Sequence, residues 1–329
     1  CFTTVSEITN NECRELLDKP ADVVLMNGFE DDFVPKGATF TGKRKRARST
    51  MLRVANCLLG EDLGDDTLII GTSGRYEFKN KGIDVFLESL NRLNRDKDLK
   101  KKVLAFVNVP SWVGDPREDL QKRLKSKDKF TEPLQCPFIT HWLHNMTHDQ
   151  VLDMLKYLGM GNRPEDKVKV IFVPCYQDGH DGILNKHYYD LILGEDLSVY
   201  PSYYEPWGYT PLESVAFRVP TITTDLAGFG LWVNSLKNQH GINDGVEVLH
   251  RSDYNYSEVA DGIKDTVALF STKTEAEIKE IRKRAGQVAE QALWKHFIQY
   301  YYEAYDIALR NAMKLSLIHI SEPTRLRCI

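Results

Sequence analysis

The sequence lacks any hydrophobic run long enough to span a bilayer. Its longest apolar segments, such as "VLAFVNV" and "VKVIFV", have the length of strands, whereas a membrane-spanning helix needs about 20 consecutive apolar residues. It also lacks excess positive charge, because the net charge is −4 over 329 residues. We interpret the one dense basic run, Lys43 to Arg48, as a solvated helix face, since binding a phosphate backbone needs many convergent cations. We therefore expect neither a membrane nor a nucleic acid as a partner.

Cysteine is scarce, with six residues that lie far apart and form no CxxC pair. This argues against the disulfide framework of a small secreted domain and predicts free thiols in a cytoplasmic protein. Metal-binding patterns are also weak. His141, His144 and His148 could bind a metal, but their spacing also suits an exposed helix start, and no thiol or carboxylate lies nearby in "THWLHNMTH". The segment "CYQDGHDG" lacks the paired spacing of a structural zinc site. We expect no metal and no cofactor.

The sequence does contain a regular alternation of apolar strands and amphipathic helices. The predicted strands are Thr67–Gly71, Val103–Val109, Val168–Val173, Leu197–Ser202, Pro220–Asp225 and Gly245–His250. The predicted helices begin near Ile83 and then cover Asp149–Leu158, His187–Leu193, Pro211–Phe217, Leu226–Leu236, Ser257–Phe270, Glu275–Gln291 and Trp294–Asn311. This alternation predicts an α/β fold with a Rossmann-like, doubly wound parallel sheet. A ligand is expected at the carboxyl ends of its strands.

Both ends and one internal segment depart from this alternation. Residues 1–30 start inside what resembles the end of a strand, followed by a helix that Thr9 or Asn10 caps, so we expect them to be the remainder of a preceding domain. Residues 31–292 form the predicted α/β domain, with a Lys-, Asp- and Pro-rich insertion at 110–147. An aromatic helix follows at 293–314, and residues 315–329 break its pattern and are interpreted as a non-native tail.

The segment "YEPWGYTPLE", Tyr204 to Glu213, connects a predicted strand to a predicted helix. Such a turn exposes backbone N–H groups and the positive end of the helix dipole, which together bind phosphate oxygens. Gly208 allows close approach of a ligand, Glu205 can accept hydrogen bonds from sugar hydroxyls, and Glu213 can reach a second polyol such as a ribose. This arrangement suits a nucleotide sugar. The two glutamates could equally supply negative charge near a helix N-terminus, and their spacing alone leaves both interpretations open.

A second cluster follows the first core strand, in "GTSGRYEFKNKG", Gly71 to Gly82. It combines two glycines in a strand-to-helix turn with two lysines and an arginine near the next helix start. Cations at this position would neutralise a diphosphate leaving group as its bond breaks, without a metal. The alternative is a charged loop that caps the helix. Because both motifs lie on strand-to-helix turns of one sheet, together they favour a nucleotide-sugar site.

The sequence also resembles a known family. "GRYEFKNKG", "YPSYYEPWGYTPLE" and "PTITTDLAGFG" closely resemble signature segments of the animal and fungal type of glycogen synthase, a family of retaining glycosyltransferases. The resemblance extends from "FTTVSEIT" to "LWKHFIQYYYEAYDIALRN", most of the chain. It implies a GT-B fold of two facing Rossmann-like domains. Residues 31–292 would be the C-terminal, donor-binding domain, residues 1–30 the end of the N-terminal, acceptor-side domain, and the helix at 293–314 would cross back to it.

The resemblance implies transfer of glucose from UDP-glucose to the non-reducing end of an α-1,4-glucan, with retention of configuration. Carried onto this chain, it implies catalytic roles for Arg75, Lys81 and Glu205. The two cations would bind the diphosphate and stabilise the departing UDP, while Glu205 would hold the donor glucose. Because the acceptor-side domain would precede Cys1, we expect this chain alone to bind the donor but to transfer glucose poorly.

The resemblance further implies a set of donor-binding residues: Gly74, Tyr176, Tyr188, Gly208, Tyr209, Thr210 and Glu213. Tyr188 would stack on the uracil. Tyr176, in "FVPCYQ" where the family has a His-Pro-Glu-Phe stretch, would close the sandwich from the other side. The amides of the turn at 208–210 would bind the phosphates, and Glu213 would hold the ribose.

Other functions remain open from the residues themselves. A sucrose- or trehalose-type glycosyltransferase has the same Glu-x7-Glu arrangement, and a non-catalytic module could bind a nucleotide sugar or a glucan. A glycogen phosphorylase needs lysine-bound pyridoxal phosphate, which no feature of the sequence requires. The long motif matches favour the synthase. The expected partners are therefore UDP-glucose and glycogen or another α-1,4-glucan acceptor, and the sequence leaves open whether the chain forms a homo-oligomer.

Overall fold

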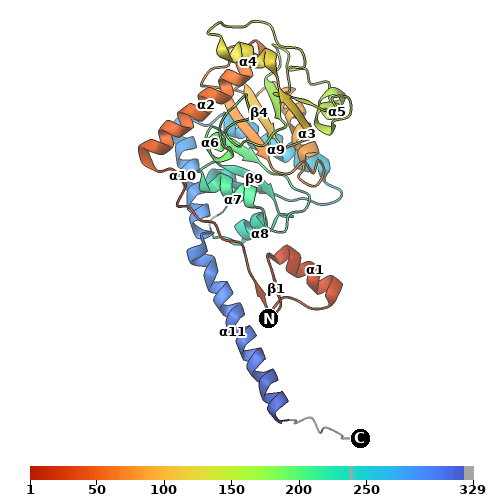
Figure 1. Ribbon diagram of the computed structural model, residues 1–329, viewed down its shortest axis with the longest axis vertical. Helices are drawn as coiled ribbons and strands as arrows, with labels where there is room; N and C mark the ends of the chain where they lie inside the picture. The colour runs from red at the N-terminus through yellow and green to blue at the C-terminus, as the bar shows by residue number, and fades with distance from the viewer. Residues whose placement is uncertain (238, 240, 322–329) are drawn as a thin grey trace.

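The computed structural model of the chain describes residues 1–237, 239 and 241–321. Its central feature is a six-stranded parallel sheet with the strand order β10-β9-β8-β3-β4-β7 (Figure 1). The strands are β3 (Leu68–Ser73), β4 (Val103–Asn108), β7 (Val168–Val173), β8 (Leu197–Val199), β9 (Thr221–Thr224) and β10 (Val246–Leu249). All six predicted strands are found, although β8 ends before the predicted Ser202. The predicted α/β fold with a doubly wound parallel sheet is confirmed.

The strand order reverses in the middle of the sheet. From β3 the chain proceeds through β4 to β7 on one side, and from β8 it proceeds through β9 to β10 on the other. β3 and β8 are neighbours, and they pair in parallel at Ile70 with Leu197 and at Gly71 with Ser198. Ligands of such sheets bind outside the carboxyl ends of the strands, at the point of reversal. The topology therefore places the candidate site beyond the ends of β3 and β8.

Helices cover both faces of the sheet because successive strand residues point to opposite sides. Ile70 belongs to a core that the helices α3 (Ile83–Asn94), α5 (Gln150–Tyr157) and α9 (Tyr256–Ser271) complete. Its neighbour Ile69 belongs to a core on the opposite face. The helices on that face are α2 (Gly37–Leu59), α6 (Tyr188–Ile192), α7 (Tyr209–Ala216), α8 (Gly228–Ser235) and α10 (Glu275–Gln291). The strand interiors are buried from both sides, which explains their near-continuous apolar sequence.

The N-terminal segment forms a small unit outside the main sheet. β1 (Thr3–Thr4), α1 (Glu7–Leu17) and β2 (Val23–Val24) make a β-α-β arrangement in which the two strands pair in parallel. The unit lies beside α8 and α11 (Figure 1). The predicted cap at Thr9 or Asn10 is wrong, because Ser6 caps α1 and its hydroxyl accepts the amide of Thr9 in a capping box. That residues 1–30 are the remainder of another domain stays a prediction.

The insertion at 110–147 is folded. It contains β5 (Val113–Pro116), α4 (Glu118–Lys125) and β6 (His141–Leu143), with β5 and β6 paired antiparallel. The fully buried Arg117 holds it together by donating to the carbonyl oxygens of Gln135, Cys136 and Ile139. The prediction of a helix start at His141 is wrong, since this residue is in β6 and is buried.

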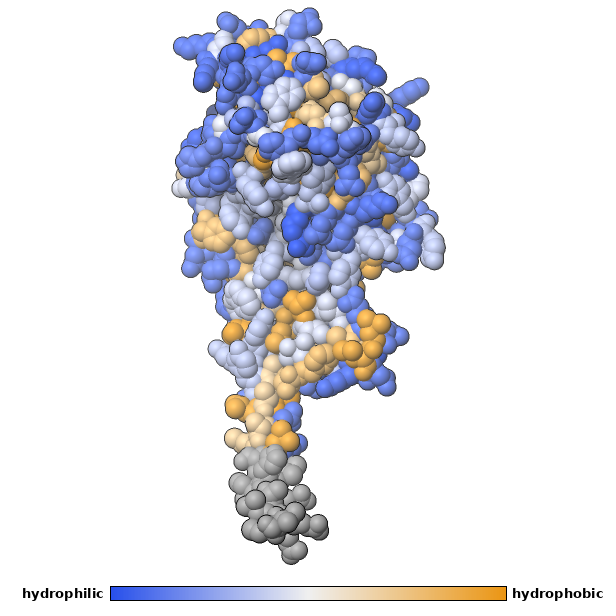
Figure 2. Space-filling view, turned by 45° about the vertical axis from the view of Figure 1, so that its right-hand side comes forward, coloured by the Kyte–Doolittle hydropathy of each residue, from blue (hydrophilic) through white to orange (hydrophobic). Residues whose placement is uncertain are grey.

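The last helix, α11 (Trp294–Ser321), extends away from the sheet domain (Figure 1). It continues beyond Asn311 and past Leu315, where the sequence predicted its pattern to break, while residues 322–329 of the predicted tail lie outside the described residues. Figure 2 shows apolar surface towards this end of the molecule, in contrast to the mostly hydrophilic sheet domain. Among the described residues, no helix combines the length and hydropathy that crossing a membrane requires.

The basic run in α2 is only partly solvated. The guanidinium groups of Arg44 and Arg48 turn towards the sheet and form ion pairs with Asp196, at 2.5 and 2.6 Å. Their side chains are 19% and 13% exposed, whereas the Lys43 side chain is 39% exposed. The interpretation of Lys43 to Arg48 as a solvated face is therefore wrong for the two arginines, because each has a carboxylate partner that is distant in sequence.

Candidate functional site

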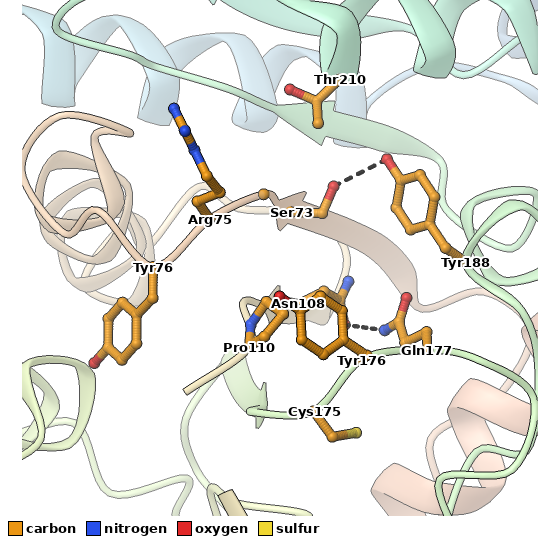
Figure 3. A pocket seen from close by; sticks show the side chains of 11 residues that line it. Ser73, Arg75, Tyr76, Asn108, Pro110, Cys175, Tyr176, Gln177, Tyr188 and Thr210 are labelled. Atoms are coloured by element: carbon orange, nitrogen blue, oxygen red, sulfur yellow. Dashed lines mark hydrogen bonds between the residues drawn. The ribbon is translucent and has the colours of Figure 1, made fainter. Parts of the chain in front are cut away.

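A cleft of about 350 Å³ opens at the carboxyl edge of the sheet, where β3, β4 and β7 end. Loops after these three strands form most of its wall, and α6 and α7 complete it (Figure 3). The lining residues are Ser73, Gly74, Arg75, Tyr76, Asn108, Pro110, Cys175, Tyr176, Gln177, Tyr188 and Thr210. The cleft lies beside the reversal of strand order: it includes the end of β3, and in the described part of the chain Thr210 is the one lining residue that follows β8.

The loop after β3 presents a cation to the cleft. Gly74 has φ 141°, a conformation that side chains disfavour, and an added Cβ would meet nothing within 4 Å. The backbone turn therefore requires glycine here, while packing does not. The next residue, Arg75, extends towards the side of the cleft on which Thr210 lies (Figure 3). Its side chain is 76% exposed, and its ion pair with Glu77, at 2.9 Å, is a surface contact of little strength. The guanidinium group is therefore available to an anionic ligand.

Two tyrosines face the cleft from different sides (Figure 3). The hydroxyl of Tyr188 lies 3.0 Å from Oγ of Ser73, which is 3.3 Å from the hydroxyl of Tyr200. Burial raises the pKa of Tyr188 well above its ordinary value, so the phenol stays neutral and its ring is fixed by the hydroxyl contact. Tyr176 lies beside Pro110 and is 78% exposed. Whether the two rings sandwich a base stays a prediction.

The turn that precedes α7 is anchored by a buried side chain and ends at a glycine. Gly208, the residue before the helix, has φ 107°, and among the described residues no side chain caps this helix end. Trp207 is 3% exposed and anchors the turn through its carbonyl, which accepts the amide of Phe229 at 2.6 Å. Thr210, at the second position of α7, lines the cleft. The unpaired amides of a helix start are suited to phosphate oxygens.

Lys81 and Glu205 meet although they are 124 positions apart. Their charged groups form an ion pair, and the two side chains are only 15% and 18% exposed. The loops that carry them, after β3 and β8, are joined by a hydrogen bond from the amide of Tyr203 to the carbonyl of Asn80, at 2.8 Å. The structure thus brings together a cation and a carboxylate that were both predicted to be catalytic.

Glu213 lies in α7, close to these loops but outside the cleft lining. Burial raises its pKa, while the hydroxyl of Tyr189, which donates to its carboxylate at 2.8 Å, partly opposes this shift. The ring of Tyr189 is in turn stacked on Phe217 with the centroids 5.1 Å apart. The carboxylate is therefore held in one position.

The predicted site residues fall into two groups. Gly74, Arg75, Tyr176, Tyr188 and Thr210 line the cleft, whereas Lys81, Glu205, Gly208, Tyr209 and Glu213 do not. Sequence reasoning missed several lining residues: Ser73, Tyr76, Asn108, Pro110, Cys175 and Gln177. A signal was present, because all of them lie at or just beyond the ends of β3, β4 and β7, where ligands of parallel sheets bind. The roles of all these residues remain predictions.

The histidine segment at 141–148 and the segment "CYQDGHDG", which were considered separately as metal sites, lie close together in the structure. Ligand atoms of His141, Cys175 and Asp181 lie within 4.8 Å of one another. The histidine is already engaged, with Nε2 2.7 Å from the carbonyl of Asp181 and Nδ1 2.9 Å from the hydroxyl of Thr140. Burial lowers the pKa of His141, which favours the neutral ring. These contacts explain the cluster as a structural one, and the expected absence of a metal stays a prediction.

Comparisons with known proteins show the family of the chain. The sequence matches the family described as "Glycogen synthase" over residues 1–119 and 114–324. It is 28% identical to "Glycogen [starch] synthase" of Neurospora crassa, over 96% of this chain and 52% of the relative. It is 29% identical to "Glycogen [starch] synthase isoform 2" of Saccharomyces cerevisiae, over 94% of this chain and 53% of the relative. The chain therefore spans about half the length of the curated relatives it matches.

Solved structures of GT-B glycosyltransferases share the fold. The catalytic domain of starch synthase IV from Arabidopsis thaliana, bound to ADP and acarbose, aligns with a TM-score of 0.56 at 11% identity. The alignment covers 94% of this chain and 55% of that protein. This likeness confirms the GT-B type of the predicted fold. Together with the family match over nearly the whole chain, it shows that the chain belongs to the glycogen synthase family of glycosyltransferases.

Proposed function

We propose that this chain carries the donor site of a glycogen synthase, which transfers glucose from UDP-glucose to the non-reducing end of an α-1,4-glucan with retention of configuration. The observation that carries the proposal is the cleft at the reversal of strand order. It collects an exposed arginine, two tyrosines and the start of α7 in one place. These are the groups that a nucleoside diphosphate needs, namely a cation, aromatic surface and free amides.

Arg75 and Lys81 act on the diphosphate in this proposal. Departure of UDP leaves negative charge on the oxygen that linked it to glucose, and positioned cations lower the barrier by stabilising that charge without a metal. Arg75 is free to turn to the ligand because its contact with Glu77 is exposed. Lys81 is held by Glu205 at the edge of the site. The ion pair keeps the carboxylate of Glu205, which orients the sugar in this proposal, next to the ammonium group of Lys81, which stabilises the negative charge on the departing UDP.

Glu213 and the turn before α7 position the rest of the donor. The amides of Gly208, Tyr209 and Thr210 bind phosphate oxygens, and the carboxylate of Glu213 binds the ribose. Tyr188 and Tyr176 bind the base. No metal or cofactor takes part in this proposal, and we place the protein in the cytoplasm, where glycogen is made.

Family membership favours glycogen synthase over a sucrose- or trehalose-type enzyme, because the match extends over almost the whole chain. A binding module without catalysis would not require Lys81 and Glu205 to meet in a partly buried ion pair. The Arabidopsis structure binds ADP, so the base of the donor is the part of the proposal that most needs a test.

The proposal is tested by calorimetric titration of the chain with UDP and, separately, with ADP. We expect UDP to bind and ADP to bind more weakly, with Tyr188→Ala weakening UDP binding. The matched control is Tyr157→Ala, which removes an exposed tyrosine, 87% accessible, from the end of α5. If neither nucleotide binds, or if both tyrosine variants bind UDP like the wild type, the cleft is not a nucleotide site.

Transfer itself is tested in the complete enzyme, because this chain alone is expected to transfer glucose poorly, by incubating it with UDP-glucose and glycogen and following UDP release. Glu205→Gln should lower kcat far more than it raises the donor KM, since a carboxylate that orients the sugar as its bond breaks acts mainly in the transition state. Glu213→Gln should act chiefly on KM, because a ribose contact is equal in the ground and transition states. The same kinetic pattern in both variants would refute this division of roles.

A further inference from the structure

The folded insertion presents aromatic side chains outwards, next to the cleft. Trp112 precedes β5 and is 73% exposed, and Trp142, in the middle of β6, is 36% exposed. His144, just after β6, contacts the ring of Trp112 with the centroids 4.9 Å apart. We call Trp112, Trp142 and His144 the aromatic platform. None of these residues has a role in the donor site described above.

The pairing of β5 with β6 explains why the platform faces solvent. Val113 pairs with Leu143, and a hydrogen bond from the amide of His144 to the carbonyl of Trp112, at 3.1 Å, continues this antiparallel pairing. Side chains alternate between the two faces of a strand. Leu143 is buried, and Val113 packs beside the core. Trp142 and His144, which flank Leu143, therefore occupy the outward face with Trp112.

A glycine leaves space on this face. A Cβ added at Gly114 would lie 3.2 Å from the carbonyl oxygen of Trp142 and 4.0 Å from Cε1 of His144. Any side chain at this position would therefore project among the platform residues. With glycine, the surface next to the rings stays open to a flat ligand.

The platform is fixed in place. The guanidinium carbon of the buried Arg117 lies 4.4 Å from the centroid of the Trp142 ring, a cation–π contact that supports the ring from below. Backbone hydrogen bonds hold the segment before β5, because the amide of Ser111 donates to the carbonyl of Pro174 at 2.9 Å. Pro110, two residues before Trp112, lines the donor cleft. The platform is thus a rigid extension of the cleft wall.

The surroundings of the platform favour a sugar over a nucleic acid or a protein as its ligand. A nucleic acid would need cations beside the rings, but the arginine under Trp142 is fully buried and committed to carbonyl oxygens. A specific protein interface buries about 1,000 Å² or more, whereas the platform consists of three side chains, of which Trp142 is only 36% exposed. Pyranose rings fit better, because their C–H faces contact aromatic rings while their hydroxyls reach polar groups at the edge.

We propose that the aromatic platform is a glucan-binding site, which holds sugar rings of an α-1,4-glucan outside the donor cleft. The identity of the glucan rests on the proposed function, whereas the platform itself rests on the geometry of β5 and β6. A glucan chain held here lies beside the cleft wall, because Trp112 is two residues from the lining residue Pro110. This raises the local concentration of acceptor ends without contributing to the chemical step.

The test is binding of maltoheptaose and of glycogen to the 329-residue chain, by calorimetry and by affinity electrophoresis. Trp112→Ala should weaken maltoheptaose binding about tenfold or more, which corresponds to the loss of one buried aromatic contact. Trp112→Phe should restore most of the affinity, because it keeps a ring. His144→Ala, a second exposed position, should weaken binding less. Tyr157→Ala is the control, and UDP affinity should be unchanged in all four variants.

The outcomes separate this inference from the proposed function. If the wild type binds maltoheptaose and Trp112→Ala does not, the platform is a glucan site, even if UDP fails to bind and the proposed function is wrong. If the wild type binds UDP but Trp112→Ala and Tyr157→Ala bind maltoheptaose equally, the platform inference is overturned and the proposed function stands. Self-association that Trp112→Ala abolishes, without glucan binding by the wild type, also overturns it. Unfolding midpoints of the variants confirm that each remains folded.

Discussion

The carboxyl and amino edges of the central sheet both carry arginines, but in different surroundings. At the carboxyl edge, the side chain of Arg75 is 76% exposed and forms an ion pair with Glu77, whose side chain is 36% exposed. At the amino edge, just before β8, the carboxylate of Asp196 accepts hydrogen bonds from Arg44 and Arg48, and from the amide of Ile69 at 2.9 Å. A charge that the protein pairs and buries depends on its partner, whereas a charge left exposed beside a cleft is available to a ligand.

Asp196 illustrates the paired state. Burial by itself would raise its pKa, but Arg48 and Arg44 hold the pKa below its usual range. The ion pairs connect α2 to the start of β8, over 148 positions of sequence for Arg48. By contrast, Arg282 of α10 lies in the same region, and burial followed by the nearby charge of Arg44 lowers its pKa well below the usual value. Asp196 is therefore needed to neutralise Arg44 and Arg48, whereas burial disfavours the charged form of Arg282.

The largest effect is expected for Asp196→Ala. This change leaves Arg44 and Arg48, which are only 19% and 13% exposed, without their carboxylate, which should lower the free energy of unfolding by about 3–5 kcal/mol. Urea denaturation measures it. Arg282→Met is the matched variant in the same cluster, and it should be near neutral or stabilising, because it removes a cation whose charged form burial disfavours. Equal destabilisation by both changes would contradict this division.

Glu195, the neighbour of Asp196, should make stability depend on pH. Burial raises the pKa of Glu195 to about 8 from its ordinary 4.5, and Ser198 donates to its carboxylate at 2.7 Å. Because the folded-state pKa is above the unfolded value, the stabilisation is fully present below about pH 4.5 and is lost as pH rises to about 8. Glu195→Gln should remove this loss of a few kcal/mol. Unfolding curves at several pH values between these limits measure the difference, and parallel pH profiles for both proteins would exclude this role.

A smaller effect is expected at the carboxyl edge for Tyr189→Phe. The hydroxyl of Tyr189 opposes the rise that burial imposes on the pKa of Glu213, so its removal should raise that pKa further. If Glu213 binds the ribose as a carboxylate, UDP affinity should fall by about 0.5–1.5 kcal/mol. As pH falls, the variant should begin to lose affinity at a higher pH than the wild type. Titration with UDP at pH 5 to 8 tests this, and coincident pH profiles would remove Glu213 from the site.

Local patterns predicted the central sheet well because each strand is an uninterrupted apolar run. β7, for example, matches its prediction at both ends, Val168–Val173. The small strands β5 and β6 were not predictable in this way. They are short, and their position depends on the buried Arg117, whose carbonyl partners come from a loop about 20 residues further along the chain. The basic run in α2 was misinterpreted for a related reason. The carboxylate of Asp196, which pairs with Arg44 and Arg48, lies 152 and 148 positions away from them in sequence.

The candidate site was predictable in part. Gly74 and Gly208 have positive φ values, 141° and 107°, as strand-to-helix turns around a ligand require. The meeting of Lys81 with Glu205 was not visible in their spacing, because it depends on β3 and β8 being neighbours in the sheet. The pairing of Tyr189 with Glu213 was also missed, since the two residues lie 24 positions apart and a tyrosine alone gives no signal of a carboxylate partner.

The placement of the donor site at the carboxyl edge, and not at the amino edge, is tested most directly by calorimetric titration of UDP into the wild type, Arg75→Ala and Lys283→Ala. Lys283 is the matched cation of the amino edge, with a side chain that is 64% exposed. Arg75→Ala should weaken UDP binding by about 1.5–3 kcal/mol, the range for a charge-assisted hydrogen bond, while Lys283→Ala should bind UDP like the wild type. Unchanged affinity in Arg75→Ala, or an equal loss in Lys283→Ala, would contradict the assignment of the donor site to the carboxyl edge.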